Sequence, residues 1–213
     1  MSKPNLERLG GLAAILGGLA ISSFNLVEFL AFSSRPFSEL AQSRGWTLFQ
    51  IFGLVGITFL ILGLISLYSA QAAHAGWFGL AAFALALLGA LQYYGVSWAG
   101  AFLMPAVGRA APAVLDQPDA ALSLGVISTI FVSAAGWLAF AVATLRAHLF
   151  PRWAPIAILF AVGLSLATEL AKISVPIGPV ILGIAIAGMG YALFTRDSKI
   201  ALAGSANATI SRE

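Results

Sequence analysis

Six apolar runs follow one another along the chain, each nearly free of charged residues and separated from the next by a more polar segment. They cover residues 9–31, 46–68, 76–103, 120–145, 154–171 and 177–194. A helix needs roughly 20 apolar residues to cross a bilayer core of about 30 Å, and each run is about that long. Helices satisfy their own backbone hydrogen bonds in lipid, which an open sheet cannot do. The pattern therefore predicts an all-α, polytopic integral membrane bundle of six transmembrane helices.

The composition supports a membrane protein and narrows its chemistry. The 213 residues are 60% hydrophobic and 9% charged, with a mean hydropathy of +0.96, whereas soluble domains carry about 25% charged residues. The basic residues are scattered, which excludes the basic face that nucleic-acid binding needs. The chain has no cysteine, and its two histidines fall at predicted helix ends, so we expect no metal site and no cofactor.

The loops predict that both termini are cytoplasmic. In this orientation more basic residues lie inside than outside, as the positive-inside rule requires. The inner set is Lys3, Arg8, Arg146, Arg152, Arg196, Lys199 and Arg212, and the outer set is Arg35, Arg44, Arg109 and Lys172. We expect the first helix to be uncleaved, because its apolar run is longer than a signal-peptide core. Residues 196–213 are predicted to form a disordered cytoplasmic tail.

The longest loop, residues 104–119, contains three prolines together with alanine and valine. It would lie on the membrane surface or fold over the mouth of the bundle. A rigid linker and a lid are both consistent with this composition.

Polar residues within the predicted helices gather at one depth. Asn25 and Glu28 share a face of the first helix, being three residues apart. At 1.5 Å per residue, Gln92 and Glu169 each lie about 23 Å from an inner aromatic residue at the start of their helix. Gln50 reaches a similar level, and the sixth helix contributes no polar residue. The predicted ligand-binding residues in this outer third of the bundle are Asn25, Glu28, Gln50, Gln92, Tyr93, Glu169 and Lys172.

The two carboxylates allow more than one interpretation. Glu28 and Glu169 would be costly inside hydrocarbon and would then be functional or paired. In one interpretation they are helix-end residues that reach the headgroups, with Lys172 pairing with Glu169 and Arg35 or Arg44 neutralising Glu28. In the other they line a pocket that opens to the outer face. A deep proton relay is the third.

Small residues predict close helix packing. Gly125, Thr129 and Ser133 form a stripe on the fourth predicted helix, and Gly183 and Ala187 form one on the sixth. Such stripes let helices approach closely in lipid. We expect these two helices to pack against neighbours, either within the bundle or across a homo-oligomer or partner interface.

The segment LFPRWAPIAILFAVGLSL and the last helix ending in GMGYALFTR resemble the carboxy-terminal half of bacterial membrane proteins of the DUF4386 type. The shared motif is Pro151, Arg152 and Trp153, an interfacial anchor before the penultimate helix. The resemblance covers about a quarter of the chain. It implies a location in the bacterial inner membrane and carries over no catalytic or binding residue.

The sequence contains no HExxH, GxSxG or phosphate-loop motif, so an enzyme is not the predicted class. We predict an inner-membrane protein, in contact with membrane lipids, that binds or transports a small amphiphile, lipid or ion through the outer polar pocket. The alternative is a non-catalytic scaffold or subunit that binds a partner through its small-residue helix faces.

Overall fold

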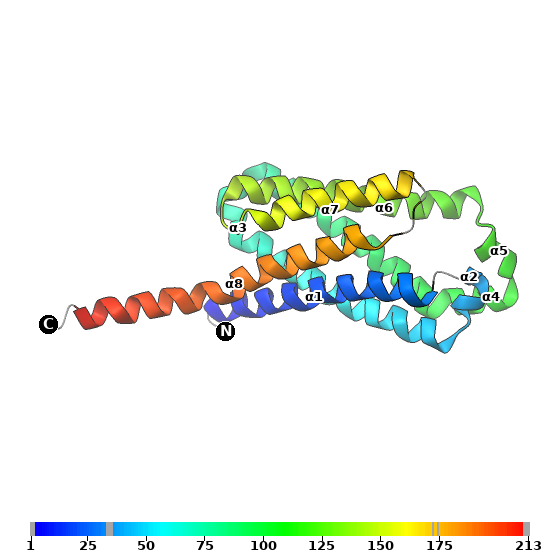
Figure 1. Cartoon of the computed structure of the whole chain (residues 1–213), viewed down its shortest axis with the longest axis horizontal. Coiled ribbons are helices and arrows are strands. Elements are labelled where there is room, and N and C mark those ends of the chain that lie inside the picture. The colour runs from blue at the N-terminus through cyan, green and yellow to red at the C-terminus, as the bar shows by residue number, and fades with distance from the viewer. Residues whose placement is uncertain (1–2, 33–35, 172, 174, 211–213) are drawn as a thin grey trace.

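The computed structural model describes residues 3–32, 36–171, 173 and 175–210, and the side chains among them from residue 7 to residue 196. This part of the chain is helical and contains no strand. The elements are α1 (Lys3–Phe32), α2 (Phe37–Ala41), α3 (Arg44–Trp98), a π-helical turn η1 (Ala99–Leu103), α4 (Met104–Ala110), α5 (Pro112–Asp116), α6 (Ala120–Ala147), α7 (Trp153–Leu170) and α8 (Ile177–Ile210). Figure 1 shows the long helices lying roughly alongside one another.

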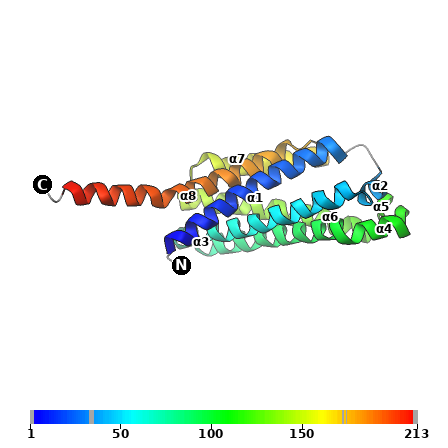
Figure 2. The same ribbon diagram turned by 90° about the horizontal axis from the view of Figure 1, so that it is seen from below.

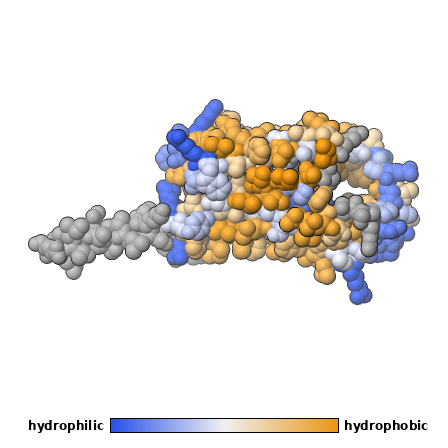
Figure 3. Space-filling view, viewed as in Figure 1, coloured by the Kyte–Doolittle hydropathy of each residue, from blue (hydrophilic) through white to orange (hydrophobic). Residues whose placement is uncertain are grey.

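Within the described residues, five helices are long and apolar enough to cross a membrane. They cover Glu7–Phe32, Arg44–Ala110, Ala120–Ala147, Trp153–Leu170 and Ile177–Arg196. In the space-filling view, apolar side chains cover the middle of the molecule and hydrophilic ones collect at its two ends (Figure 3). This is the surface expected of a bundle whose waist contacts lipid, so the predicted class of an apolar, all-helical bundle is confirmed.

The second and third predicted helices form one element, α3, with a break at Gly76. Gly76 has φ 59° and ψ −160°, which is not helical and which a residue with a Cβ rarely adopts. On either side of this break Tyr68 stacks on Phe83, with ring centroids 4.4 Å apart. Further along, Ser97 lies beside Gly53. The two halves of α3 therefore run antiparallel, and residues 69–75, between the second and third apolar runs, are helical.

The long segments form a ring in which each packs against two others. The order is α1, the first half of α3, the second half of α3, α6, α7 and α8, and α8 closes the ring on α1. Both views show α1 and α8 side by side (Figures 1 and 2). Two ends can be distinguished: the Gly76 end, and the α2 end, where α2, α4 and α5 lie.

Small residues set the closest approaches in this ring. A Cβ on Gly183 of α8 would collide with the carbonyl oxygen of Gly18 and with Ser22, both on α1. On α6, Ser133 lies against Gly89 of α3, whereas Gly125 has no neighbour within 4 Å of its ideal Cβ position. The small residues of α6 and α8 thus serve contacts inside the bundle, and contact with a partner chain stays a prediction.

Two apolar clusters fill the ends of the ring. The larger lies toward the Gly76 end and includes the fully buried Leu64, Phe140, Ile158, Ile186 and Met189. The smaller lies at the α2 end and consists of Leu40, Ala41, Trp46, Phe49 and Leu115. The space between the two clusters is where the candidate site lies.

The described structure departs from the predicted boundaries at two further places. The segment 104–119, expected to be a loop, contains the short helices α4 and α5, and both have a proline in their first two residues. The helix α8 continues through Ile210, into the segment expected to be a disordered tail, and Figure 1 shows it projecting beyond the Gly76 end.

Candidate functional site

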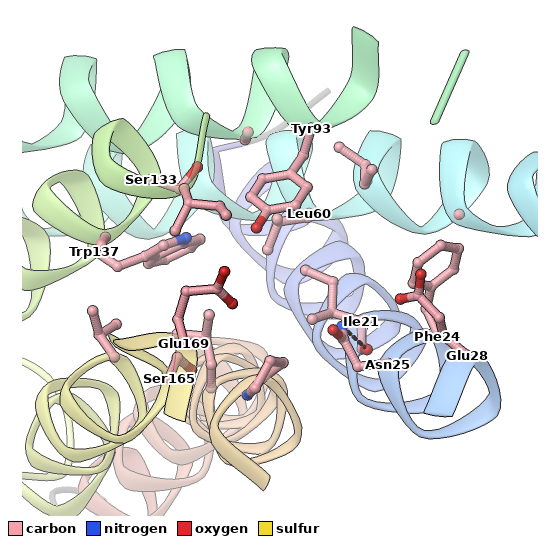
Figure 4. Close-up of a pocket in the computed structure, with 18 of the residues that line it drawn as sticks. Ile21, Phe24, Asn25, Glu28, Leu60, Tyr93, Ser133, Trp137, Ser165 and Glu169 are labelled. Atoms are coloured by element: carbon pink, nitrogen blue, oxygen red, sulfur yellow. Dashed lines mark hydrogen bonds between the residues drawn. The ribbon is translucent and has the colours of Figure 1, made fainter. Parts of the chain in front are cut away.

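A cavity of about 370 Å³ lies inside the ring, between the two apolar clusters. Residues from α1, both halves of α3, α6, α7 and α8 line it, as Figure 4 shows for the labelled side chains. Its polar and aromatic lining comprises Phe24, Asn25, Glu28, Tyr93, Ser97, Ser133, Trp137, Ser165, Thr168 and Glu169. The volume is at the lower end of the range of small-molecule sites.

The large apolar cluster borders the cavity on the side of the Gly76 end, and this side is called the floor. Leu60, Ala90, Trp137 and Val162 belong to that cluster and also line the cavity. These four side chains are at most 5% exposed, so the floor is closed toward the Gly76 end. A molecule in the cavity would contact the apolar floor on the side of the Gly76 end and the polar residues of α1 and α7 on the side of the α2 end.

Two carboxylates stand at the open side of the cavity. Glu28 lies in the last turns of α1 and Glu169 is the penultimate residue of α7, and both side chains are solvent-exposed. In Figure 4 the Glu169 carboxylate points toward Tyr93 and Trp137, and Glu28 lies at the other side of the cavity. Neither carboxylate forms an ion pair or hydrogen bond with another of the described residues. The two carboxylates therefore face the cavity and its opening, and no described residue there pairs with them.

Tyr93 connects the two carboxylates. It extends from the second half of α3, and its hydroxyl points into the cavity in Figure 4. Both Glu28 and Glu169 are close enough to interact electrostatically with this hydroxyl. The phenol of Tyr93 therefore lies within electrostatic range of both carboxylates.

Several polar side chains of the lining are already engaged with their own helices. The Asn25 amide nitrogen donates to the Ile21 carbonyl at 2.9 Å. The Ser165 hydroxyl donates to Ala161 at 2.9 Å, and the Thr168 hydroxyl lies 3.0 Å from two carbonyl oxygens of α7. The two hydroxyls have used their only hydrogen and offer a ligand acceptor oxygens, whereas the Asn25 amide keeps its oxygen and a second N–H.

Four of the residues predicted from the sequence therefore lie around one cavity: Asn25, Glu28, Tyr93 and Glu169. Gln50 and Gln92 do not line it. Gln50 is buried against Gly100 across the hairpin of α3, and the side-chain oxygen of Gln92 is buried without a hydrogen-bond partner. Lys172 lies outside the described residues. Whether any of these residues binds a ligand stays a prediction.

The structure adds residues that sequence reasoning missed. Ser97 lies four residues after Tyr93 and one helical turn along the same face, a spacing that was readable in the sequence. Trp137 and Ser133 come from α6, where their position depends on the contact of this helix with α3. From α8 the lining receives only the apolar Pro179 and Leu182.

A second cavity of about 300 Å³ adjoins the first at the α2 end. Asn25, Glu28, Val175 and Pro179 line both cavities, so Glu28 stands between them. Phe37 and Leu40 of α2 form part of its wall. The helix α2 therefore covers the approach to Glu28.

Hydrogen bonds hold α2 to the segment 104–119. The Ser38 backbone N–H donates to Asp116 Oδ1 at 2.9 Å, and the Ser38 hydroxyl donates to Oδ2 at 2.7 Å. These two bonds, followed by one from the Phe37 N–H, lower the pKa of the Asp116 carboxyl. The Gln42 side chain donates to the Gly108 carbonyl at 3.1 Å. The segment 104–119 is thus hydrogen-bonded to α2, which forms a wall of the second cavity. This contact is consistent with a lid and with a rigid linker.

The described residues contain no group of three or more His, Cys, Asp or Glu side chains that could hold a metal ion. Comparisons of the chain with protein-family models, with curated proteins and with solved structures find no match. The resemblance to the DUF4386 type therefore stays a prediction, and the geometry of the cavity carries the functional argument.

Proposed function

We propose that this chain is a six-span protein of the bacterial inner membrane that binds a small amphiphilic molecule in the cavity between Glu28 and Glu169. The observation that carries the proposal is an apolar floor together with two carboxylates at the open side that have no partner among the described residues. Such a surface suits a molecule with an apolar part and a polar head. Carriage of this molecule across or along the membrane would follow from binding at this level.

The break at Gly76 supports six spans. Because the halves of α3 are antiparallel, each would cross the bilayer separately, and an even number of crossings puts both termini on one side. The distribution of basic residues assigns that side to the cytoplasm. The cavity would then open toward the outer face.

A scaffold that binds partners through α6 and α8 is the alternative. It has less support, because Gly183 and Ser133 are engaged inside the bundle. Exposed Gly125 on α6 is the one part of the predicted stripe that favours a contact outside it.

A cavity-filling variant tests the proposal. Ala134 of α6 lines the cavity, whereas Ala135 next to it is exposed and does not. Native mass spectrometry of the full chain, extracted in a non-ionic detergent, would detect bound small molecules or lipids. We expect a bound species in the wild type and in A135F, and its loss in A134F. An equal amount in A134F and A135F would contradict the proposal.

A further inference from the structure

We infer that the cavity selects small organic cations that carry an apolar group, such as a quaternary ammonium joined to a hydrocarbon. This inference rests on the proposed function and names the chemical class of its ligand. It is argued from the charge, the hydrogen-bonding capacity and the aromatic lining of the cavity.

The described lining of the cavity contains acidic side chains and no basic ones. Glu28 and Glu169 both line the cavity, and among its described lining residues none is Lys, Arg or His. Two carboxylates therefore face one small volume, and no basic side chain among the described residues lines it. An anion would be repelled there, and a neutral molecule would leave both carboxylates unpaired on the side it covers. A cation would be attracted to the site and would pair with both carboxylates.

The hydrogen-bonding groups on the wall formed by α1 and α7 also favour a cation. Asn25, Ser165 and Thr168 each donate to a carbonyl of their own helix, so their oxygens remain as acceptors. The second N–H of the Asn25 amide can still donate, and so can the hydroxyls of Tyr93 and Ser133 on the opposite wall. These donors are uncharged, so they do not offset the two carboxylates.

Aromatic rings complete the site. The rings of Tyr93 and Trp137 border the space into which the Glu169 carboxylate points (Figure 4). Ring faces attract cations, most strongly for Trp, and they attract quaternary ammonium groups in particular. Ile21, Ile57 and Leu166 supply apolar surface for the rest of the molecule. Carboxylates beside aromatic rings, over an apolar floor, form a site for an amphiphilic cation.

The test uses three probes of nearly the same shape. Benzyltrimethylammonium is the cation, neopentylbenzene is its neutral isostere, and phenylmethanesulfonate is the anion. Binding to the full chain in nanodiscs of a zwitterionic lipid is measured by isothermal titration calorimetry, or by competition where solubility requires it. We expect the cation to bind more tightly than either of the other probes.

Substitutions locate the binding. E28Q and E169Q keep the shape of the side chain and remove the charge, and each should weaken cation binding roughly three- to tenfold. E39Q is the control, because Glu39 is exposed on α2 and lines neither cavity. Lys172 is three residues from Glu169, so K172A is included. We expect K172A to keep or increase the preference for the cation over the anion.

The outcomes separate this inference from the proposed function. Equal binding of the cation and its neutral isostere, unaffected by E28Q and E169Q, would overturn the cation preference and leave amphiphile binding intact. Tighter binding of the anion, or loss of the cation preference in K172A, would also overturn it. Failure of all three probes, together with equal bound species in A134F and A135F, would overturn both.

Discussion

Glu28 near the end of α1 and Glu169 near the end of α7 line the same cavity, although most of the chain separates them in sequence. Each carboxylate lacks a partner among the described residues, and each is exposed at the open side. The ring of helices produces this relationship. The helices α1 and α7 both pack against α8, and a carboxylate near the end of each lines the cavity between them.

The contact between α1 and α8 makes a prediction about stability. In G183A the new methyl group would collide with Gly18 and Ser22, so the helices must separate. We expect the free energy of unfolding to fall by roughly 1–3 kcal/mol, measured as a lower melting temperature in detergent. The control is G163A, because Gly163 has no neighbour within 4 Å. Equal melting temperatures for the two variants would contradict this packing.

The break in α3 makes a second prediction. A Cβ on Gly76 would meet no atom within 4 Å, so G76A tests backbone strain alone. The positive φ should cost about 1–3 kcal/mol, seen as a lower melting temperature. G95A serves as the comparison, since Gly95 is equally uncrowded and has no positive φ. If G76A were as stable as G95A, the chain would not reverse through a glycine-only conformation there.

Topology gives a third prediction. The chain has no cysteine, so labelling of a single introduced cysteine reports the side of the membrane on which that position lies. With six spans, H74C at the Gly76 end and Q117C at the α2 end would face opposite sides of the membrane. We expect a membrane-impermeant maleimide to label Q117C in intact spheroplasts and H74C only in inverted vesicles. Labelling of both from one side would contradict the six-span arrangement.

The attachment of α2 depends on pH. Because hydrogen bonds lower the pKa of Asp116 below its unfolded value of about 3.9, this carboxylate stabilises the contact above that pH. The stabilisation is lost as the pH falls through the folded pKa. We expect faster amide hydrogen exchange in α2 near pH 3, after correction for the intrinsic rate, and in D116N already at neutral pH. E39Q should behave as the wild type. Identical protection of α2 in D116N and the wild type would contradict this role.

The sequence predicted the class of fold because hydrophobic length and helical geometry are local properties. The described residues form long apolar helices, five of which could cross a membrane, and the helix is broken at Gly76 between the second and third apolar runs. The order of the helices in the ring could not be predicted from the sequence. It depends on contacts such as that of Gly18 with Gly183, between residues at opposite ends of the chain. For the same reason, the sequence left open whether α8 packs within the bundle or against a partner.

The sequence predicted how deep in the bundle the candidate site lies, but only partly which side chains face it. A rise of 1.5 Å per residue placed Gln92 and Tyr93 at one level, and both are there. Successive residues of a helix point about 100° apart, so depth alone does not decide which of the two faces a given space. Tyr93 lines the cavity and Gln92 does not. Choosing between them requires the neighbours of α3, which the hydrophobic pattern does not supply.

The most direct test of the central claim is the access of a small reagent to residue 169. In E169C the only thiol of the chain would stand in the cavity, and a small methanethiosulfonate reagent should modify it in the membrane-embedded protein. We predict that adding A134F slows this modification, whereas adding the neighbouring A135F leaves its rate unchanged. Equal rates in the two double variants, or an unreactive thiol in E169C, would contradict a cavity that admits a small molecule beside Glu169.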